Sequence, residues 1–268
     1  MEVMGNNIDV SYGDTSILKD VSIKAKDKKF VGIIGPNGSG KSTFLKCLYR
    51  VLKPNGGSVY IDGKELKHIS IKESAKKVAV VAQHNFYNFD FSIEEVVMMG
   101  RSPHKKNMER DNAKDYEIVN KCLEKVGMKD FKGRSFSTLS GGEQQRIILA
   151  RALAQETDCI ILDEPTNHLD IKYQLQLLDI VKELGLTIIS AIHDLNIAAM
   201  YCDYLYVMKD GNLMIQGKPK DVLTSKLIKD LYEVEADISE DKYGRTNIIY
   251  YPEHIKRGDK NENSNSSL

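Results

Sequence analysis

Two kinds of apolar pattern divide this chain into predicted strands and helices. Short, almost continuous apolar runs are typical of strands buried within a sheet. Four segments have this character: Phe30–Ile34, Val78–Ala82, Cys159–Leu162 and Thr187–Ala191. Alternating apolar and polar residues, which indicate half-buried strands, occur in Ile8–Tyr12 and Ile17–Ala25, with a turn signal at Gly13–Asp14 between them.

Helical spacing appears in the middle of the chain and in its C-terminal half. Ile93–Met99 and Asp111–Val126 have this spacing with no strand between them, and Gly127 is a suitable C-cap. This stretch is therefore predicted to be a helical insertion in an α/β domain. Further helices are predicted from Leu139–Glu143 to about Gln155, over Ile171–Leu184 and, as two short helices, over Pro219–Tyr232. Further strands are predicted at Val59–Ile61, in a hairpin of Tyr204–Met208 with Asn212–Gln216, and at Ile248–Tyr251.

The composition is that of a globular protein and narrows the classes of function. Apolar residues make up 41% and charged residues 28% of the 268 residues. Lys and Arg together equal Asp and Glu, 38 each, so net charge gives no argument for a nucleic-acid partner. The four cysteines are scattered, which indicates neither a disulfide framework nor a zinc site. We find no secretory signal and no run near the ~18 apolar residues that span a bilayer, so we expect a cytoplasmic chain.

A glycine-rich segment, residues 35–43, joins the first buried strand to a predicted helix. Its sequence, Gly-Pro-Asn-Gly-Ser-Gly-Lys-Ser-Thr, contains the Gly-x4-Gly-Lys-Ser pattern of a phosphate-binding P-loop. Glycines let backbone N–H groups face the phosphates, and the helix N-terminus adds a partial positive charge. Lys41 is expected to reach the β- and γ-phosphates and Ser42 to bind Mg²⁺. Nucleotide binding is thus the central functional prediction.

Polar side chains follow two further buried strands. Asp163–Glu164 ends one strand and His193 follows another, so they are expected at the strand-end edge where open α/β sheets bind ligands. Two adjacent carboxylates there are costly unless a cation or a reaction uses them.

Tyr12 is either an edge aromatic that covers the sheet or a platform for a nucleotide base. The aromatic segment 84–91 is either a loop folded onto the core or an exposed patch for a partner.

Six segments occur in the order and spacing of one family: Gly35–Thr43, Gln83, Leu139–Glu143, Asp163–Glu164, Leu169–Asp170 and His193. Together they resemble the ATPase subunit of ABC transporters, over roughly residues 2–235. The resemblance implies an α/β fold: a P-loop NTPase (RecA-like) core with an antiparallel β subdomain and an inserted α-helical subdomain at about residues 84–155. A short C-terminal extension at 236–257 and a disordered tail at 258–268 are expected to follow.

The resemblance also implies ATP and Mg²⁺ as cofactors and assigns the site residues. The nucleotide is expected to contact Tyr12, through adenine, and Gly35, Asn37, Gly38, Ser39, Gly40, Lys41, Ser42 and Thr43 through the phosphates. Mg²⁺ is expected on Ser42, Gln83 and Asp163. Catalysis is expected to use Glu164 as general base together with His193, Gln83 and Lys41. ATP on a second copy is expected to meet Ser140, Gly141 and Gly142, with Asp170 coupling the two sites.

The same resemblance implies the partners of the chain. Two copies are expected to sandwich two nucleotides head to tail. Two membrane-spanning permease subunits are expected to bind the pair, with Gln83–Arg101 as part of the coupling surface. An extracytoplasmic substrate-binding protein acts indirectly, and no nucleic acid is expected. The chain would then lie peripherally on the cytoplasmic face of the cell membrane.

A narrower resemblance concerns the cargo. Three segments are similar to importers of iron–siderophores, haem and cobalamin: Phe91–His104, Asn167–Ile171 with Gln174, and Leu231–Val234. Within this branch we favour an iron–siderophore, as the commonest cargo.

A non-transport ABC protein is the alternative to a transporter subunit. Proteins of that kind carry two cassettes or long coiled coils, whereas this chain has one cassette and no sustained heptads. A P-loop kinase or GTPase would lack the Leu139–Glu143 turn and the Gln83/His193 pair.

Overall fold

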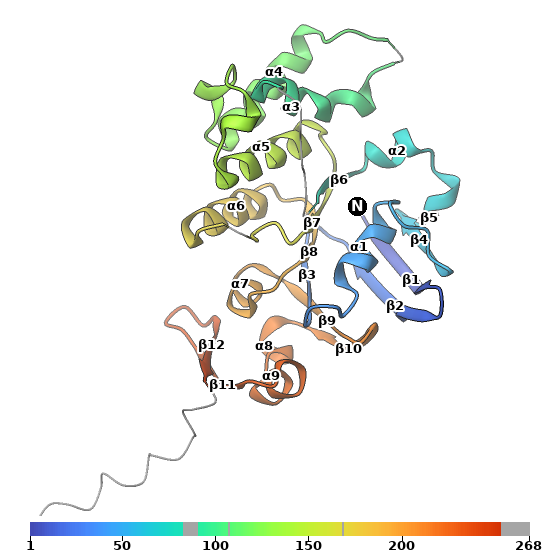
Figure 1. The fold of residues 1–268 in the computed structure, drawn as a ribbon, viewed down its shortest axis with the longest axis vertical. Helices are drawn as coiled ribbons and strands as arrows, with labels where there is room; N and C mark the ends of the chain where they lie inside the picture. Colours follow the sequence, from blue (N-terminus) through green and yellow to red (C-terminus); the bar gives the residue numbers. More distant parts are fainter. Residues whose placement is uncertain (83–90, 107, 168, 253–268) are drawn as a thin grey trace, which may run out of the picture.

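The computed structural model describes residues 1–82, 91–106, 108–167 and 169–252, and a mainly parallel sheet lies at its centre (Figure 1). Within these ranges the sheet has six strands in the order β10-β9-β3-β8-β7-β6. Their bounds are β3 (Phe30–Ile34), β6 (Val78–Val81), β7 (Cys159–Asp163), β8 (Thr187–Ala191), β9 (Tyr204–Lys209) and β10 (Asn212–Gly217). Neighbours pair in parallel except β9 and β10, which form the predicted hairpin. The four predicted buried strands are confirmed, with small shifts at their ends.

Both faces of this sheet are covered, which explains why its strands are continuous apolar runs. Successive side chains of a strand point to opposite faces. In β3, Phe30 and Ile34 therefore enter one core, and Val31 and Ile33 enter the other. The first core lies beneath helices, and the second lies between this sheet and an antiparallel one.

The antiparallel sheet packs beside the helix that follows the glycine-rich loop (Figure 1). Among the described residues its order is β2-β1-β4-β5. The elements are β1 (Val3–Tyr12), β2 (Thr15–Ala25), α1 (Lys41–Leu48), β4 (Gly56–Ile61) and β5 (Lys64–Glu65). The predicted alternation is confirmed, since Ile8 and Val10 are buried while Asp9 and Ser11 are exposed. β1 begins earlier than predicted, at Val3.

The predicted helical insertion is confirmed between β6 and β7, and Figure 1 shows it at one end of the molecule. It contains α3 (Ile93–Met98), the 3₁₀ helix η2 (Met99–His104), α4 (Ala113–Lys125), η3 (Lys129–Phe131), η4 (Phe136–Thr138) and α5 (Gly141–Ala154). The three α-helices each begin with a capping box, in which the N-cap side chain and the third helical residue bond to each other's backbone N–H. Gly127, with φ of +67°, ends α4 as predicted.

The remaining elements lie outside these two sheets and the helical insertion. They are η1 (Leu66–His68), α2 (Ile71–Ala75), α6 (Ile171–Glu183), α7 (Leu195–Tyr201), α8 (Pro219–Val222), α9 (Ser225–Tyr232), β11 (Glu235–Glu240) and β12 (Thr246–Tyr251). The two short helices of residues 219–232 are confirmed. Sequence analysis missed α2, α7 and β11, because elements this short carry little periodicity. The part of the chain that the structure describes contains no helix with the length and apolar character that crossing a membrane requires.

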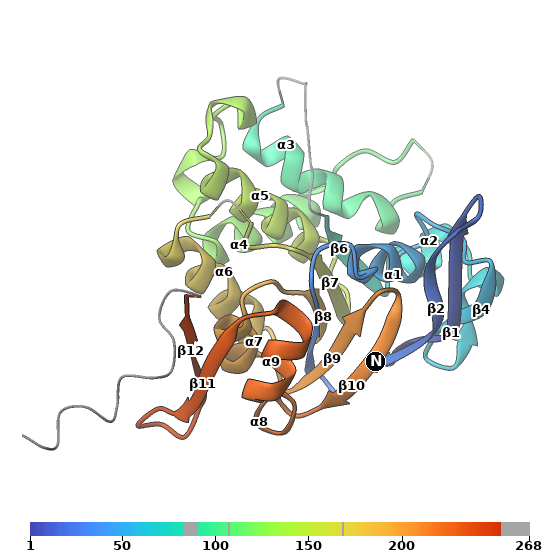
Figure 2. The same ribbon diagram turned by 60° about the horizontal axis from the view of Figure 1, so that its bottom comes forward.

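The predicted last strand, β12, pairs with β11, and Figure 2 shows this hairpin beside α7. The side chain of Asn196 donates to the carbonyl oxygen of Ile248 at 3.1 Å and accepts from its N–H at 2.8 Å. Ala236 and Ile248 are buried in the main core. The hairpin is thus packed onto the domain, while the boundaries predicted at 236 and 258 stay predictions. The predicted tail, 258–268, lies outside the described residues.

Candidate nucleotide site

The predicted P-loop joins β3 to α1 at the carboxyl end of the parallel strands. Gly35 has φ of +150° and Gly40, the N-cap of α1, has φ of +99°. A Cβ at Gly35 would lie 2.1 Å from the carbonyl oxygen of Met208, and one at Gly40 would lie 2.6 Å from the side chain of Leu18. Both positions therefore require glycine for backbone conformation and for space. The turn they permit leaves the N-terminus of α1 facing a prospective anion.

Lys41 is the first residue of α1, and its side chain folds back over the loop. Its Nζ donates hydrogen bonds to the carbonyl oxygens of Gly35 at 2.8 Å and Pro36 at 2.9 Å. Burial lowers the pKa of Lys41, and the carboxylates of Glu164 and Asp163 oppose that shift. The ammonium is thus held among carbonyl oxygens, where phosphate oxygens would offer stronger, charge-assisted hydrogen bonds.

Ser42 and Asp163 come together from α1 and from the end of β7. The hydroxyl of Ser42 donates to Oδ1 of Asp163 at 2.7 Å, and the hydroxyl of Tyr49 lies 3.4 Å from Oδ2. Burial raises the pKa of Asp163, and the hydrogen bond from Ser42 opposes that shift. A small hard cation would stabilise this buried charge, and hydroxyl and carboxylate oxygens are ligands that Mg²⁺ accepts. The pair therefore fits the predicted metal site.

The rest of the predicted metal site is only partly described. Gln83, the third predicted ligand and a predicted catalytic residue, lies outside the described residues. Within the described ranges, no group of three or more His, Cys, Asp or Glu side chains could hold a metal ion.

The carboxylate of Glu164 is held at both oxygens. Nε2 of His193 contacts Oε1, and Nδ2 of Asn167 donates to Oε2 at 2.6 Å. The structure thus brings Glu164 and His193 together at the ends of β7 and β8, as the sequence predicted. Glu164 has φ of +53°, a conformation that non-glycine residues rarely adopt and that clusters at functional sites. Asn167 was a contact that sequence analysis missed.

A shallow cavity of about 290 Å³ lies over the loop. Its walls are Tyr12, Ile17, Asn37, Gly38, Gly40, Lys41, Ser42, Thr43 and Glu164. Tyr12 is 57% exposed, so it does not cover the core, and its role as a platform for a base stays a prediction. Gly35, Ser39 and His193 do not line this cavity. Ser39 is buried, and its hydroxyl has no hydrogen-bond partner among the described residues.

The Leu-Ser-Gly-Gly-Glu turn begins α5 and lies apart from this cavity. The carboxylate of Glu143 accepts from the hydroxyl of Ser140 at 2.7 Å and from its N–H at 2.9 Å, and these bonds lower the pKa of Glu143. A Cβ at Gly141 would meet nothing within 4 Å, so packing within this chain does not require glycine there. Ser140, Gly141, Gly142 and Asp170 do not line the P-loop cavity. The predicted nucleotide contacts therefore form two separate groups on one chain.

The 3₁₀ helix η2, part of the segment with the narrower resemblance, is fastened inside the helical insertion. Arg101 donates to the carboxylates of Asp115 at 3.0 Å and Glu156 at 2.7 Å. A Cβ at Gly100 would lie 2.1 Å from the carbonyl oxygen of Arg151. These contacts fix η2 against α4 and the end of α5, so this segment has a structural function.

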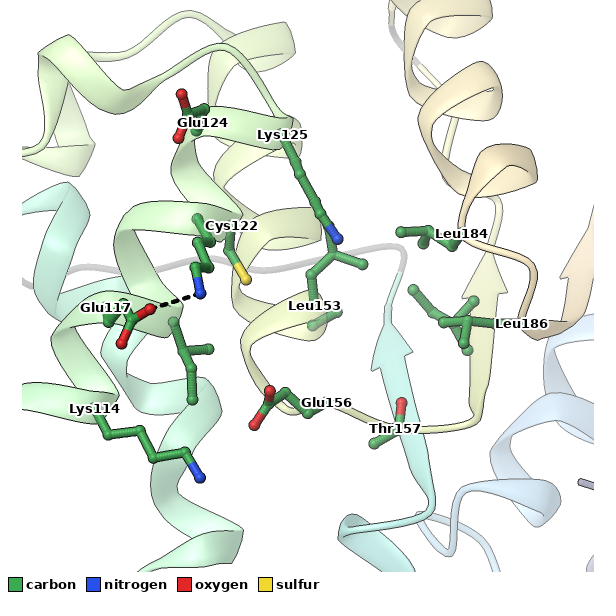
Figure 3. A pocket seen from close by; sticks show the side chains of 14 residues that line it. Lys114, Glu117, Cys122, Glu124, Lys125, Leu153, Glu156, Thr157, Leu184 and Leu186 are labelled. Carbon is green, nitrogen blue, oxygen red and sulfur yellow. Dashed lines mark hydrogen bonds and ion pairs between the residues drawn. The ribbon is translucent and has the colours of Figure 1, made fainter.

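The structure also contains a cavity that no sequence pattern predicts. It has a volume of about 640 Å³ and lies between α4, the end of α5 and the segment before β8. Figure 3 shows α4 on one side and Leu184 and Leu186 on the other, with Glu156 and Thr157 between them. Its walls come from segments far apart in the chain, and it contains none of the predicted site residues.

Comparison with known proteins shows which family combines these features. Residues 18–167 match the family model of ABC transporters. The chain is 36% identical over 249 residues to the ferric enterobactin transport ATP-binding protein FepC of Escherichia coli, across 91% of this chain and 92% of FepC. It is 38% identical over 242 residues to the iron(3+)-hydroxamate import ATP-binding protein FhuC of Bacillus subtilis, across 89% of each.

A solved structure agrees with these relatives in fold. The dimeric structure of MJ0796, a bacterial ABC transporter cassette, matches with a TM-score of 0.72 at 29% identity, over 81% of this chain and 98% of that one. The P-loop core, the antiparallel subdomain and the helical subdomain are therefore those of an ABC ATPase. This chain belongs to the ABC transporter family, as an ATP-binding subunit that acts as a transport ATPase.

Proposed function

We propose that this chain hydrolyses ATP to drive the import of a metal chelate, in first place an iron–siderophore. The observation that carries the catalytic part is the convergence of Lys41, the Ser42–Asp163 pair and Glu164 beside one cavity. The cargo is supported by FepC and FhuC, whose names refer to iron transport and import. A haem or cobalamin importer is the alternative, because the three similar segments fit that whole branch.

ATP is proposed to bind with its phosphates over the P-loop and its adenine on Tyr12. The N-terminus of α1 and the N–H groups of residues 37–43 would supply donors and partial positive charge. Lys41 would exchange its carbonyl partners for phosphate oxygens. When bound, Mg²⁺ would neutralise charge on the β- and γ-phosphates, and Ser42, Asp163 and Gln83 would hold it.

Hydrolysis is proposed to use Glu164 as the general base for water. Phosphoryl transfer depends mainly on positioning and charge neutralisation, which a fixed carboxylate beside a cationic loop supplies. His193 contacts Oε1 of Glu164 and would move to the γ-phosphate when ATP binds. That exchange would leave Oε1 able to accept a proton from the attacking water.

A second copy of the chain is proposed to complete the site. Ser140, Gly141, Gly142 and Asp170 lie apart from the P-loop cavity, so they would contact ATP held by the partner copy. Two features support this: the N-terminus of α5 attracts anions, and Gly141 leaves open space for a close approach. The dimeric structure solved for MJ0796 is consistent with such a pair.

The pair is proposed to bind two membrane-spanning subunits at the cytoplasmic face of the membrane, with an external binding protein acting indirectly. A groove of about 470 Å³ between the end of α1, α2 and η2 would receive a helix of such a subunit. Tyr49 lines the groove and its hydroxyl lies 3.4 Å from Oδ2 of Asp163, so the groove adjoins the proposed Mg²⁺ site. Of the expected coupling surface, residues 83–90 lie outside the described residues, and Arg101 is buried and supports the groove from within.

Uptake by a deletion strain tests the proposed function. The strain, grown under iron limitation on a panel of labelled ferric siderophores, should fail to take up at least one of them. The wild-type gene should restore that uptake, and the Glu164→Gln gene should not. Normal use of every siderophore with lost uptake of cobalamin or haem would overturn the choice of cargo and leave the ATPase standing.

A further inference from the structure

The loop that follows β7 is held in place by one side chain of α6. Nε2 of Gln174 donates to the carbonyl oxygen of Thr166 at 3.1 Å and to that of Leu169 at 2.9 Å. Both hydrogens of one amide group are thus used on two points of the same loop. The sequence singled out Gln174 through the narrower resemblance and gave it no function.

The same loop holds the carboxylate of Glu164. Asn167 lies between the two carbonyl groups that Gln174 binds, and its Nδ2 donates to Oε2 of Glu164 at 2.6 Å. Its N–H also donates to the carbonyl oxygen of Glu164, at 3.3 Å. Gln174 is therefore linked to Glu164 by its hydrogen bond to Thr166, the peptide bond between Thr166 and Asn167, and the hydrogen bond from Asn167 to Glu164.

The backbone at the start of this loop needs such support. Glu164 has φ of +53°, and a non-glycine residue keeps this conformation only where its surroundings enforce it. A loop with fewer fixed points would let the Glu164 side chain sample other positions. A displacement of about 1 Å at a reacting group costs on the order of 100-fold in rate.

We propose that Gln174 is a positioning residue for the Glu164 carboxylate, acting through the carbonyl groups of Thr166 and Leu169 and through Asn167. The inference rests on the proposed function of Glu164 as general base. Gln174 does not line the P-loop cavity, so it supports the rate of hydrolysis and not the binding of ATP. A glutamine suits this position because its amide offers two donors, whereas a carboxylate of the same shape offers none and would face two carbonyl oxygens.

The test compares Gln174→Glu with Gln176→Glu in the full-length chain. Gln176 is an exposed residue of the same helix, so its variant matches the charge change and leaves the loop untouched. Gln174→Glu should lower kcat for Mg-ATP about 10- to 100-fold, with KM and ATP affinity within about twofold of wild type. Gln176→Glu should match wild type. Wild-type kcat in Gln174→Glu, or an equal loss of ATP affinity, would overturn the inference.

A double variant separates positioning from general support of the fold. In a Glu164→Gln background the carboxylate is already gone, so Gln174→Glu should cause no further loss of residual turnover, measured with radiolabelled ATP. If Gln174→Glu lowered turnover by the same factor in the Glu164→Gln background as in wild type, the inference would be overturned. If Gln174→Glu does not fold, Gln174→Met keeps the length of the side chain and replaces it in both experiments. Wild-type turnover by Glu164→Gln alone would refute the proposed base, whereas an inactive Glu164→Gln with a fully active Gln174→Glu would refute only this inference.

Discussion

Contacts with neighbouring residues hold the polar side chains of this site in place. Glu164 illustrates this, since Asn167 and His193 occupy its two carboxylate oxygens and its backbone takes a rare conformation. Lys41 is equally constrained by the carbonyl groups of Gly35 and Pro36. The two residues are proposed to serve different steps, Glu164 in hydrolysis and Lys41 in binding, and two substitutions should separate those steps.

Glu164→Gln should nearly abolish ATP hydrolysis and keep ATP binding. The amide preserves the shape of the side chain but cannot accept a proton, and loss of a general base costs roughly 10²–10⁴-fold in rate. Steady-state ATPase assays and fluorescent nucleotide titration measure the two properties. Glu183→Gln, at the exposed end of α6, is the control and should resemble wild type. Full hydrolysis by Glu164→Gln would remove this residue from the mechanism.

Lys41→Ala should instead weaken the binding of ATP itself. Its charge acts on phosphates that are already bound in the ground state, so its loss lowers affinity by at least about tenfold. The same nucleotide titration measures the effect. Lys53→Ala, an exposed lysine after α1, provides a control for loss of one positive charge. Unchanged affinity in Lys41→Ala would show that the ammonium does not contact bound phosphates.

Elements of the helical subdomain are joined by a buried ion cluster around Arg101. The side chains of Arg101 and Asp115 are both 6% exposed. If one of them is replaced, water therefore cannot solvate the charge of the other. Arg101→Met should therefore destabilise the fold by about 3–5 kcal/mol, because the buried Asp115 carboxylate loses its nearest cation and keeps only the more distant ammonium of Lys105. Chemical denaturation measures this cost. Lys121→Met removes an exposed partner of Glu117 and should leave the denaturation midpoint close to that of wild type.

The same cluster makes the stability of the fold depend on pH in the acid range. Burial raises the pKa of Asp115, but the hydrogen bonds from Arg101 and from the N–H of Asn112 outweigh it and hold the pKa below the ordinary value of 3.8. A carboxyl group whose pKa is lower in the folded state stabilises the fold at pH values above its ordinary pKa. This stabilisation is lost as the pH falls through the pKa of the folded state. Denaturation midpoints between about pH 5 and pH 2 should fall less steeply in Arg101→Met than in wild type. An equal pH dependence of the midpoint in both proteins would show that Arg101 does not lower the pKa of Asp115.

At the scale of the whole molecule, the two groups of nucleotide contacts predict an ATP-dependent dimer. The Glu164→Gln chain should elute as a dimer with Mg-ATP and as a monomer without it in size-exclusion chromatography. Adding Gly141→Glu should prevent dimer formation, because it places bulk and negative charge beside the proposed γ-phosphate contact.

The matched control for this dimer prediction is Gly133→Glu. Gly133 also lies in the helical subdomain, and a Cβ there likewise meets nothing within 4 Å. Thermal denaturation should show both variants folded like the parent chain. Dimer formation by Gly141→Glu with ATP would place the second-copy contact elsewhere.

The sequence by itself determined the local structure and most of the chemistry of the site. Strands such as β3 and β8 were predictable because a strand buried on both faces must be apolar throughout. The P-loop was predictable because its glycines, Lys41 and Ser42 stand close together in the chain, at the spacing of the phosphate-binding pattern. The start of α5 at Ser140 was predictable because a helix N-terminus needs local partners for its N–H groups.

Only the tertiary structure decided how distant segments use one another. It paired β12 with β11, fixed Arg101 against Asp115 and Glu156, and bonded Gln174 to the loop that follows β7. It also showed that Ser140 and Asp170 lie apart from the P-loop cavity of their own chain. The reason is physical: capping and burial patterns depend on residues a few positions apart, whereas these contacts depend on which surfaces meet after the chain has folded.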